Sequence, residues 1–219
     1  PESLTKIEEA PFSGCNNLVE FYGKYASEDG KYLFDGDTLL AIAPAGLTEL
    51  TLPEGITTIG EYAVGGCKQL LSITIPEGVA SIGKGAFSKC EELTEISIPT
   101  SVSYIGAEAF QLCYKLTDVT IPEGVTTIEP KTFFNCNSLK RVSIPDSVTT
   151  ISDNAFSVCP SLTDITIPES VTKIGQGAFG GCKWLKEIAI PEGVTALYDY
   201  TFSGCERLST LSLPSTLTS

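Results

Sequence analysis

The order of apolar and polar positions repeats along the chain with a 23-residue period. One unit, residues 70–92, reads LLSITIPEGVASIGKGAFSKCEE, and the units share the pattern L-x-x-I-x-I-P-x-G-V-x-x-I-x-x-x-A-F-x-x-C. A fixed period of this length is typical of repeat proteins, in which each unit packs only against its neighbours. The pattern predicts a single domain with a partial unit at 1–17, an irregular unit at 18–46, seven full units over 47–207 and a partial unit at 208–219.

Each part of the unit predicts a structural element. The L-x-x-I-x-I segment alternates apolar and polar residues and is rich in β-branched side chains, so it predicts a short strand with one buried face. The proline that follows ends the strand because it has no N–H to donate, and the next two residues, Glu-Gly in four units, predict a turn. The V-x-x-I segment returns to the core, and A-F-x-x-C predicts one or two short helical turns packed by Phe and Cys. Stacked units of this kind predict a right-handed solenoid with a parallel β-sheet on one face.

The irregular unit is longer than the regular units and lacks both the P-x-G-V and the A-F-x-x-C segments. Two short β-rich segments flank the acidic, glycine-containing turn at residues 35–37, which predicts a β-hairpin. Two interpretations of its aromatic residues are open: they contact a partner, or they cover the end of the array where the helical turn is missing. The candidate contact residues are Tyr22, Tyr25, Tyr32 and Phe34.

Equivalent positions in successive units form columns along a solenoid. The middle exposed strand position is Ser or Thr in almost every unit, whereas the position two residues earlier and the position after the proline are mostly acidic. The one cation of the first acidic column, Arg141, stands between Asp118 and Asp164 and is expected to bond one of them. Calcium binding and a glycosidase carboxylate pair are both open readings of the acidic columns. The absence of a D-x-D-x-D-G loop favours a third reading, in which the carboxylates keep the protein soluble.

Composition narrows the function classes. The formal net charge of −13 argues against nucleic acid and anionic lipid as partners, because both require a basic surface. Without any histidine the chain has no His-dependent catalytic triad and no His-ligated zinc site. No apolar run reaches the roughly 20 residues of a membrane-spanning helix, so we expect no membrane insertion. These observations predict a non-enzymatic protein without cofactor or metal.

The eight cysteines form an even number, and the last seven follow the 23-residue period. An even, regular set suggests disulfides. However, each cysteine follows the column of buried phenylalanines by three residues, which predicts that both side chains face inward. Equivalent Cβ atoms in a parallel column lie about as far apart as neighbouring strands, roughly 4.8 Å, whereas a disulfide prefers about 3.8 Å. We therefore expect free, buried thiols that act as small apolar side chains.

Trp184 is the only tryptophan, and it lies immediately before a predicted strand. Its indole is expected either to stack on a sugar or anchor a protein partner, or to be covered by Arg207, the equivalent residue of the next unit. Tyr114, Arg141 and Lys186 lie near the same edge, so positive charge and aromatic side chains meet there. These four residues, Tyr114, Arg141, Trp184 and Lys186, form the second candidate partner-binding surface.

The motif L-x-x-I-x-I-P-x-G-V-x-x-I-G-x-x-A-F-x-x-C resembles the BspA-like, or Treponema-type, leucine-rich repeats of bacterial surface proteins over about nine tenths of the chain. The resemblance implies a leucine-rich-repeat solenoid, an extracellular or cell-surface location and adhesion to a protein or glycan, such as one on a host surface. The alternative is a structural spacer within a longer surface protein. Both ends fall inside a repeat unit, so the chain is expected to be a monomeric piece of a longer protein whose export signal and anchor lie elsewhere.

Overall fold

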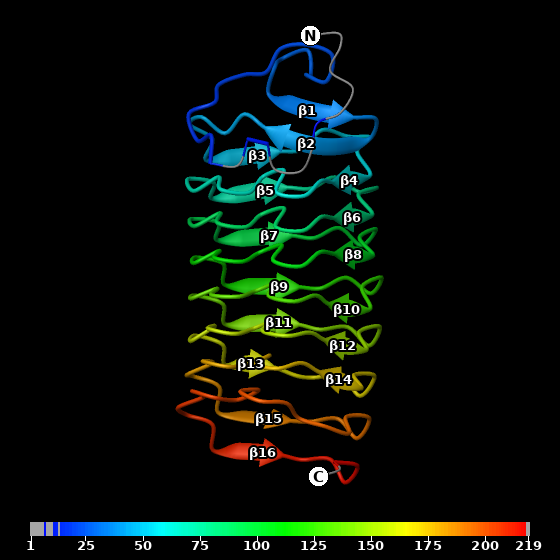
Figure 1. The fold of residues 1–219 in the computed structure, drawn as a ribbon, viewed down its shortest axis with the longest axis vertical. Coiled ribbons are helices and arrows are strands. Elements are labelled where there is room, and N and C mark those ends of the chain that lie inside the picture. Colours follow the sequence, from blue (N-terminus) through cyan, green and yellow to red (C-terminus); the bar gives the residue numbers. More distant parts are fainter. Residues whose placement is uncertain (1–6, 8–10, 13, 218–219) are drawn as a thin grey trace.

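The computed structural model describes residues 7, 11–12 and 14–217. The expected partial unit at 1–17 therefore lies mostly outside the described residues, as do the last two residues of the partial unit at 208–219. The described chain winds into a solenoid in which each turn is one repeat unit (Figure 1). The hairpin of the irregular unit lies at its N-terminal end.

The L-x-x-I-x-I segments form the predicted column of parallel strands, in which each residue pairs with its equivalent in the next unit, as Leu50 does with Ile73. The central apolar residue of the strand is buried in every unit except those of Ile165, which is half-buried, and Leu211, which is exposed, because side chains alternate between the two faces of a strand. The strands of this first column are β3 (Glu49–Thr51), β5 (Ser72–Thr74), β7 (Glu95–Ser97), β9 (Asp118–Thr120), β11 (Arg141–Ser143), β13 (Asp164–Ile165), β15 (Glu187–Ala189) and β16 (Thr210–Ser212).

A second column of very short parallel strands runs along the opposite side of the solenoid (Figure 1). It is formed by the V-x-x-I segments, for which the sequence predicted a return to the core but no strand. The isoleucine of each segment is buried, and the preceding residue pairs with its equivalent in the next unit. The strands are β4 (Thr58–Ile59), β6 (Ser81–Ile82), β8 (Tyr104–Ile105), β10 (Thr127–Ile128), β12 (Thr150–Ile151) and β14 (Lys173–Ile174).

The A-F-x-x-C segments form turns, and the prediction of helical turns was wrong. An α-helix requires successive N–H groups to donate to the carbonyl four residues earlier. Here the N–H groups alternate: Phe110 donates to the Thr132 carbonyl of the next unit at 2.9 Å, whereas Cys113 donates back to the Phe110 carbonyl at 3.2 Å. Glu108 and Leu112 have positive φ angles of 61° and 63°, which a right-handed helix excludes. Bonding to the next unit therefore replaces helix formation.

The phenylalanines of these segments stack into a continuous ladder through the core. Neighbouring ring centroids lie between 5.4 and 5.7 Å apart, with interplanar angles of 3° to 10°. Each inner ring is buried and touches a ring on either side, so the ladder joins the last six full units to one another. The members are Phe87, Phe110, Phe133, Phe156, Phe179 and Phe202.

The cysteines form a second ladder beside the phenylalanines. Each inner thiol from Cys90 onward donates to a backbone carbonyl of the preceding unit, as Cys136 Sγ does to the Phe110 oxygen at 3.1 Å. Burial raises the pKa of the Cys67, Cys113 and Cys159 thiols to about 12. The cysteines that are buried and free, as predicted, are Cys67, Cys90, Cys113, Cys136, Cys159 and Cys182.

Two cysteines differ from this expectation. Cys15 is exposed, because it lies at the N-terminal end of the array where no full unit covers it, and Cys205 is half-buried in the last full unit. We expect a thiol-alkylating reagent to modify Cys15 rapidly and Cys205 slowly in the native protein, and all eight cysteines after denaturation. Mass spectrometry of both samples measures the count. A native mass with four disulfides, or rapid modification of the inner thiols, would contradict it.

The predicted hairpin is present. Strands β1 (Tyr32–Asp35) and β2 (Thr38–Ile42) pair antiparallel, and Gly36 supplies the positive φ of 60° in the turn between them. Strand β2 also pairs in parallel with β4, so the hairpin continues the second column of strands. It covers a small apolar cluster of its own, formed by Phe21, Leu33, Ala41 and Ala43. The hairpin thus closes the N-terminal end of the main core.

Candidate functional site

The hairpin aromatics divide between covering and exposed positions. Tyr32 stacks on Phe34 at 5.8 Å between ring centroids and donates its hydroxyl to the Thr51 carbonyl at 3.0 Å. Phe34 packs against the main core, and Tyr25 is half-buried against the smaller cluster of the hairpin. Tyr22 is 83% exposed, and its hydrogen bond to Glu20 raises the pKa of its hydroxyl. Partner contact by the hairpin stays a prediction, for which Tyr22 is the exposed candidate.

Trp184 is partly covered and partly available. The Arg207 guanidinium lies over its ring, with the central carbon 3.5 Å from the ring centroid, so the predicted cation–π contact is present. The indole is nevertheless 47% exposed. It also lines a shallow pocket of 230 Å³ together with Lys140, Ser161 and Thr163. The ring is thus held by Arg207, and about half of the residue stays exposed.

Two cations near this edge are paired with carboxylates, Arg141 with Asp118 and Lys183 with Glu206. Arg141 bonds Asp118, with its Nε 2.6 Å from Oδ1, and leaves Asp164 to a hydrogen bond from Thr163. The hydrogen bond from Thr117 and the Arg141 guanidinium together lower the pKa of Asp118. These pairs offset part of the positive charge that the sequence predicted for this edge.

The four candidate residues of this surface do not converge on one point. Tyr114 is half-buried and occupies the same column as Lys183, three repeat units away from the unit of Trp184. Three strand spacings amount to about 14 Å, so Tyr114 and Trp184 cannot share a small ligand. Lys186 is exposed two residues after Trp184. Only an extended partner that crosses several units can contact all four residues.

A groove lies on the face of the first strand column, where the sequence has Ser or Thr at the middle exposed position of almost every strand. It has a volume of 480 Å³ and is lined by parts of β11, β13 and β15, including Asp164, Ile165 and Glu187. Thr163 lines both this groove and the pocket beside Trp184, so the two are neighbours. The sequence differs in the unit on one side of this groove. There Tyr198 occupies the position directly after the V-x-x-I segment, at which four other units have glycine.

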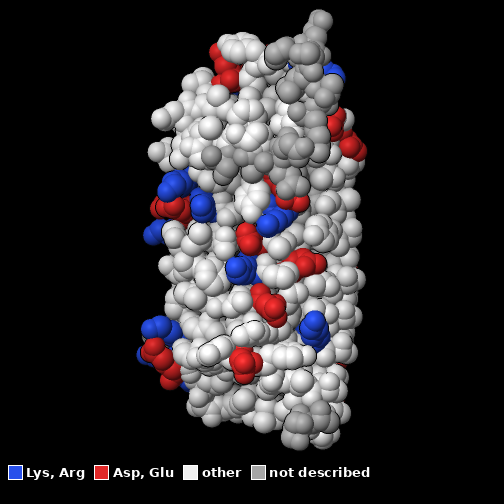
Figure 2. All heavy atoms as spheres, viewed as in Figure 1, with Lys and Arg blue, Asp and Glu red and all other residues white. Residues whose placement is uncertain are grey.

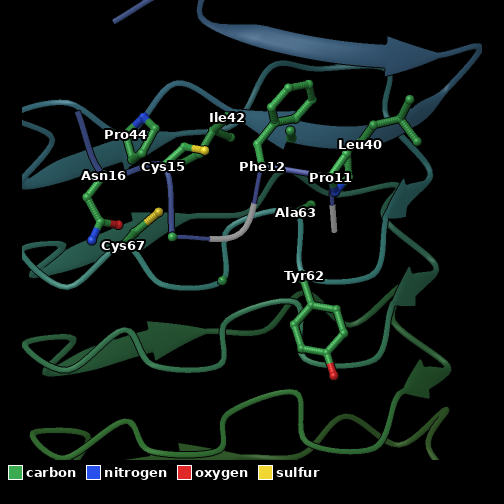
Figure 3. Close-up of a pocket in the computed structure, with 13 residues that line it drawn as sticks. Pro11, Phe12, Cys15, Asn16, Leu40, Ile42, Pro44, Tyr62, Ala63 and Cys67 are labelled. Carbon is green, nitrogen blue, oxygen red and sulfur yellow. The ribbon is translucent and has the colours of Figure 1, made fainter. Parts of the chain in front are cut away.

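A smaller cavity lies under the N-terminal segment (Figure 3). Phe12, Cys15 and Asn16 lie there over Ala63 and Cys67 of the first full unit. Its volume of 20 Å³ holds about one water molecule. This cavity is therefore a packing gap and is too small to be a ligand site.

The surface charge is mixed on the face that Figure 2 shows, where Lys, Arg, Asp and Glu side chains alternate without a broad area of one sign. Among the described residues, no group of three Cys, Asp and Glu side chains is placed to hold a metal ion. In the same part of the chain, no helix has the length and apolar character required to cross a membrane.

Comparison with known proteins agrees with this fold. A leucine-rich repeat protein of T. pallidum is 26% identical over 95% of this chain and 84% of its own, with a TM-score of 0.57. A leucine-rich repeat protein from Eubacterium ventriosum is 29% identical over 82% of this chain, with a TM-score of 0.60. The match spans only 56% of the Eubacterium ventriosum chain. No curated protein matches the chain.

A family model supports the same assignment from sequence. The model for the BspA type leucine rich repeat region matches six copies, over residues 40–163 and 149–219. The matched ranges include the regular repeat units, both strand columns and the two ladders of the core. The chain therefore belongs to the BspA-type leucine-rich repeat family.

Proposed function

We propose that this chain is a non-enzymatic recognition module of an extracellular or cell-surface protein, and that it binds a protein or glycan around Trp184. The observation that carries the proposal is the half-exposed indole, held by Arg207 in a pocket that shares Thr163 with the groove on the sheet face. Binding sites combine such aromatic anchors with a few polar groups on a rigid scaffold. The family resemblance and the net charge of −13 support a surface location and a partner other than nucleic acid.

The pKa of one carboxylate close to the groove argues against a role of that group as a general acid. A glycosidase requires one carboxylic acid with a raised pKa, so that it holds a proton at neutral pH. Asp118, close to this surface, has a lowered pKa because of Thr117 and Arg141. Its carboxylate therefore stays ionised and paired at neutral pH, which suits a structural contact and not a general acid.

A spacer role is the second candidate, and a specific observation favours it. In three units a serine hydroxyl after the proline donates to a carbonyl of the preceding unit at 2.7 to 2.8 Å. These bonds add to the backbone bonds between units and make the array stiff. The serines are Ser101, Ser147 and Ser170.

Replacing Trp184 by alanine is expected to weaken binding of a macromolecular partner at least about tenfold, because a central indole often contributes about 2 kcal/mol or more. A glycan array and a screen of purified host surface proteins would identify the partner, and titration calorimetry would compare the variants. Tyr104→Ala is the matched control, since Tyr104 is 48% exposed but lies in the second strand column.

The possible results separate the candidate functions. Weaker binding of Trp184→Ala with unchanged binding of Tyr104→Ala supports recognition at the Trp184 surface. Unchanged binding of Trp184→Ala with loss in Tyr22→Ala assigns recognition to the hairpin instead. If neither substitution changes the affinity for any partner found, the spacer role is the better account.

A further inference from the structure

Both strand columns are interrupted between the same repeat units. The first column is paired from β3 to β7, from β9 to β13 and from β15 to β16. The second column is paired from β2 to β8 and from β10 to β14. The interruptions therefore lie between the units of β8 and β10, and between the unit of β14 and the unit that follows it.

The second interruption opens a wedge between β13 and β15. In the units on either side, one carbonyl accepts two N–H groups of the next unit: Lys140 accepts those of Thr163 and Asp164, both at 3.1 Å. Within the described chain, the equivalent bonds from Lys186 and Glu187 to the Thr163 carbonyl are absent. Three backbone groups at this edge are thus free to bond a ligand: the Thr163 carbonyl and the N–H groups of Lys186 and Glu187.

The same two units remain joined on the turn side. The Phe179 N–H donates to the Thr201 carbonyl at 3.0 Å, and the Gly181 N–H donates to the Ser203 carbonyl at 2.7 Å. The rings of Phe179 and Phe202 stack at 5.7 Å. The units therefore lose their pairing along the strand columns and stay joined through the turns and the ring ladder.

The residue after each strand of the second column accounts for both interruptions. Where it is glycine, the backbone of the preceding unit is very close: a Cβ on Gly106 would lie 2.6 Å from the Lys84 nitrogen, and one on Gly60 would lie 2.7 Å from the Leu39 oxygen. Such approach leaves no room for a large side chain. Pairing is retained in each unit with a small residue here, namely Gly60, Gly83, Gly106, Ser152 and Gly175.

Large residues occupy this position at both interruptions. Glu129 follows β10, where the pairing with β8 is lost, and Tyr198 follows the segment that fails to pair with β14. Tyr198 is 52% exposed, so its ring lies outside the core. The larger of the two side chains coincides with the interruption that holds the 480 Å³ groove. A bulky residue at this position thus coincides with the loss of pairing at both interruptions.

The groove presents an apolar floor with acidic walls. Ile165 is half-buried, whereas its equivalents Val142 and Ile188 are buried, so opening of the wedge exposes it. Three carboxylates line the groove, from Asp146, Asp164 and Glu187. The one cation among the described residues that line it, Arg141, is already paired with Asp118. An occupant that satisfies free strand edges and acidic walls is an extended peptide with basic side chains.

We propose that the wedge between β13 and β15 binds an extended, lysine- or arginine-rich peptide segment of a partner protein. The peptide backbone bonds the free groups of Thr163, Lys186 and Glu187, its apolar side chains cover Ile165, and its basic side chains meet Asp164 and Glu187. This inference rests on the proposed recognition function and specifies the class of partner. A volume of 480 Å³ is within the range of about 300 to 1,000 Å³ that ligand sites occupy.

A labelled heptapeptide of alternating lysine and valine is the probe, and a peptide of alternating glutamate and valine is its control. Fluorescence anisotropy should show one saturable site for the lysine peptide and none for the control. The double variant Asp164→Lys/Glu187→Lys is expected to weaken binding at least tenfold. Glu54→Lys/Glu77→Lys makes the same charge change on the acidic rim of other units, outside the groove, and should leave the affinity within about twofold.

Tyr198→Gly tests the wedge itself without altering a residue that lines the groove. We expect the wedge to close, so that amide hydrogen exchange at Lys186 and Glu187 slows and peptide affinity falls at least tenfold. Glu129→Gly removes the bulk at the other interruption and should leave the peptide affinity unchanged. Slower exchange with unchanged affinity would overturn the proposal.

If amide hydrogen exchange at Lys186 and Glu187 does not slow in Tyr198→Gly, the substitution has not closed the wedge. The double variant Asp164→Lys/Glu187→Lys then tests the site by itself. Peptide binding that has several equivalents and is insensitive to the double variant would show attraction to the acidic surface in general, and it would overturn the wedge as the site. These results concern the peptide probe. They are independent of the effect of Trp184→Ala on a macromolecular partner, so failure of the wedge proposal leaves the broader recognition proposal to its own test.

Discussion

Raising the pH from 9 to 10 is expected to bring the native protein close to unfolding. Six buried thiols are neutral in the folded state, and burial raises the pKa of each well above its ordinary value near 9, to about 12 for Cys67, Cys113 and Cys159. In the unfolded chain these groups ionise near pH 9. Ionisation of the thiols therefore does not reduce the free energy of unfolding well below pH 9. Above pH 9 it lowers this free energy progressively, until the pH reaches the pKa values of the thiols in the folded state.

The expected size of this loss is large. Each pH unit above 9 favours the unfolded state by about 1.4 kcal/mol per thiol, so six thiols together lower the free energy of unfolding by about 8 kcal/mol at pH 10. The free energy of unfolding of a typical domain is about 5 to 15 kcal/mol. Urea unfolding followed by circular dichroism at pH 7, 9 and 10 measures the effect directly.

Two cysteine variants separate the thiols from other groups that titrate at high pH. Cys136→Ala removes one buried thiol and should reduce the pH dependence of the unfolding free energy above pH 9 by about a sixth. Cys15→Ala removes an exposed thiol and should leave that dependence unchanged. A free energy of unfolding that stays constant from pH 8 to 10 would show that the inner thiols are not buried as the structure has them.

The regular part of the fold was predictable because the repeat keeps one length. Constant spacing puts equivalent residues in register, so the parallel first column and the inward-facing Phe and Cys residues follow from the pattern. The hairpin was also predictable, since an acidic, glycine-containing turn separates two β-rich segments. Both predictions depend on local sequence or on the period alone.

The incorrect predictions share one physical cause, which is hydrogen bonding between units. The sequence of one unit favours a helical turn at A-F-x-x-C, but every second N–H group there, such as that of Phe110, donates to the next unit. The strands of the second column have only two residues, too few to show an alternating pattern. Both features arise only when units stack.

The candidate site was predicted in part. The contact between Trp184 and Arg207 followed from their shared column, because equivalent residues of adjacent units are neighbours. The groove beside them did not follow, since it depends on how closely the backbone at Tyr198 can approach the preceding unit. That distance is set by packing between units, although the substitution of tyrosine for glycine is visible in the sequence.

Phe133→Ala is expected to lower the free energy of unfolding by roughly 3 to 5 kcal/mol, the usual cost of removing a buried ring. Phe133 is fully buried and stacks on Phe110 and Phe156, with ring centroids 5.4 Å away on both sides. Its loss leaves a cavity between two units, and in a repeat array the coupling between neighbours sets how cooperatively the whole chain unfolds. Urea denaturation measured by circular dichroism and by Trp184 fluorescence gives both the loss and the cooperativity.

Phe202→Ala is the matched comparison, because Phe202 is half-buried and has one ring neighbour among the described residues, Phe179, at 5.7 Å. Its removal should cost less than half as much as that of Phe133, since fewer contacts are lost and water can fill the space. In Phe133→Ala the weakened contact lies in the middle of the array, so the fluorescence of Trp184 and the circular dichroism should no longer change at the same urea concentration. Equal losses in the two variants, or coincident transitions in Phe133→Ala, would show that the ring ladder does not couple the repeat units.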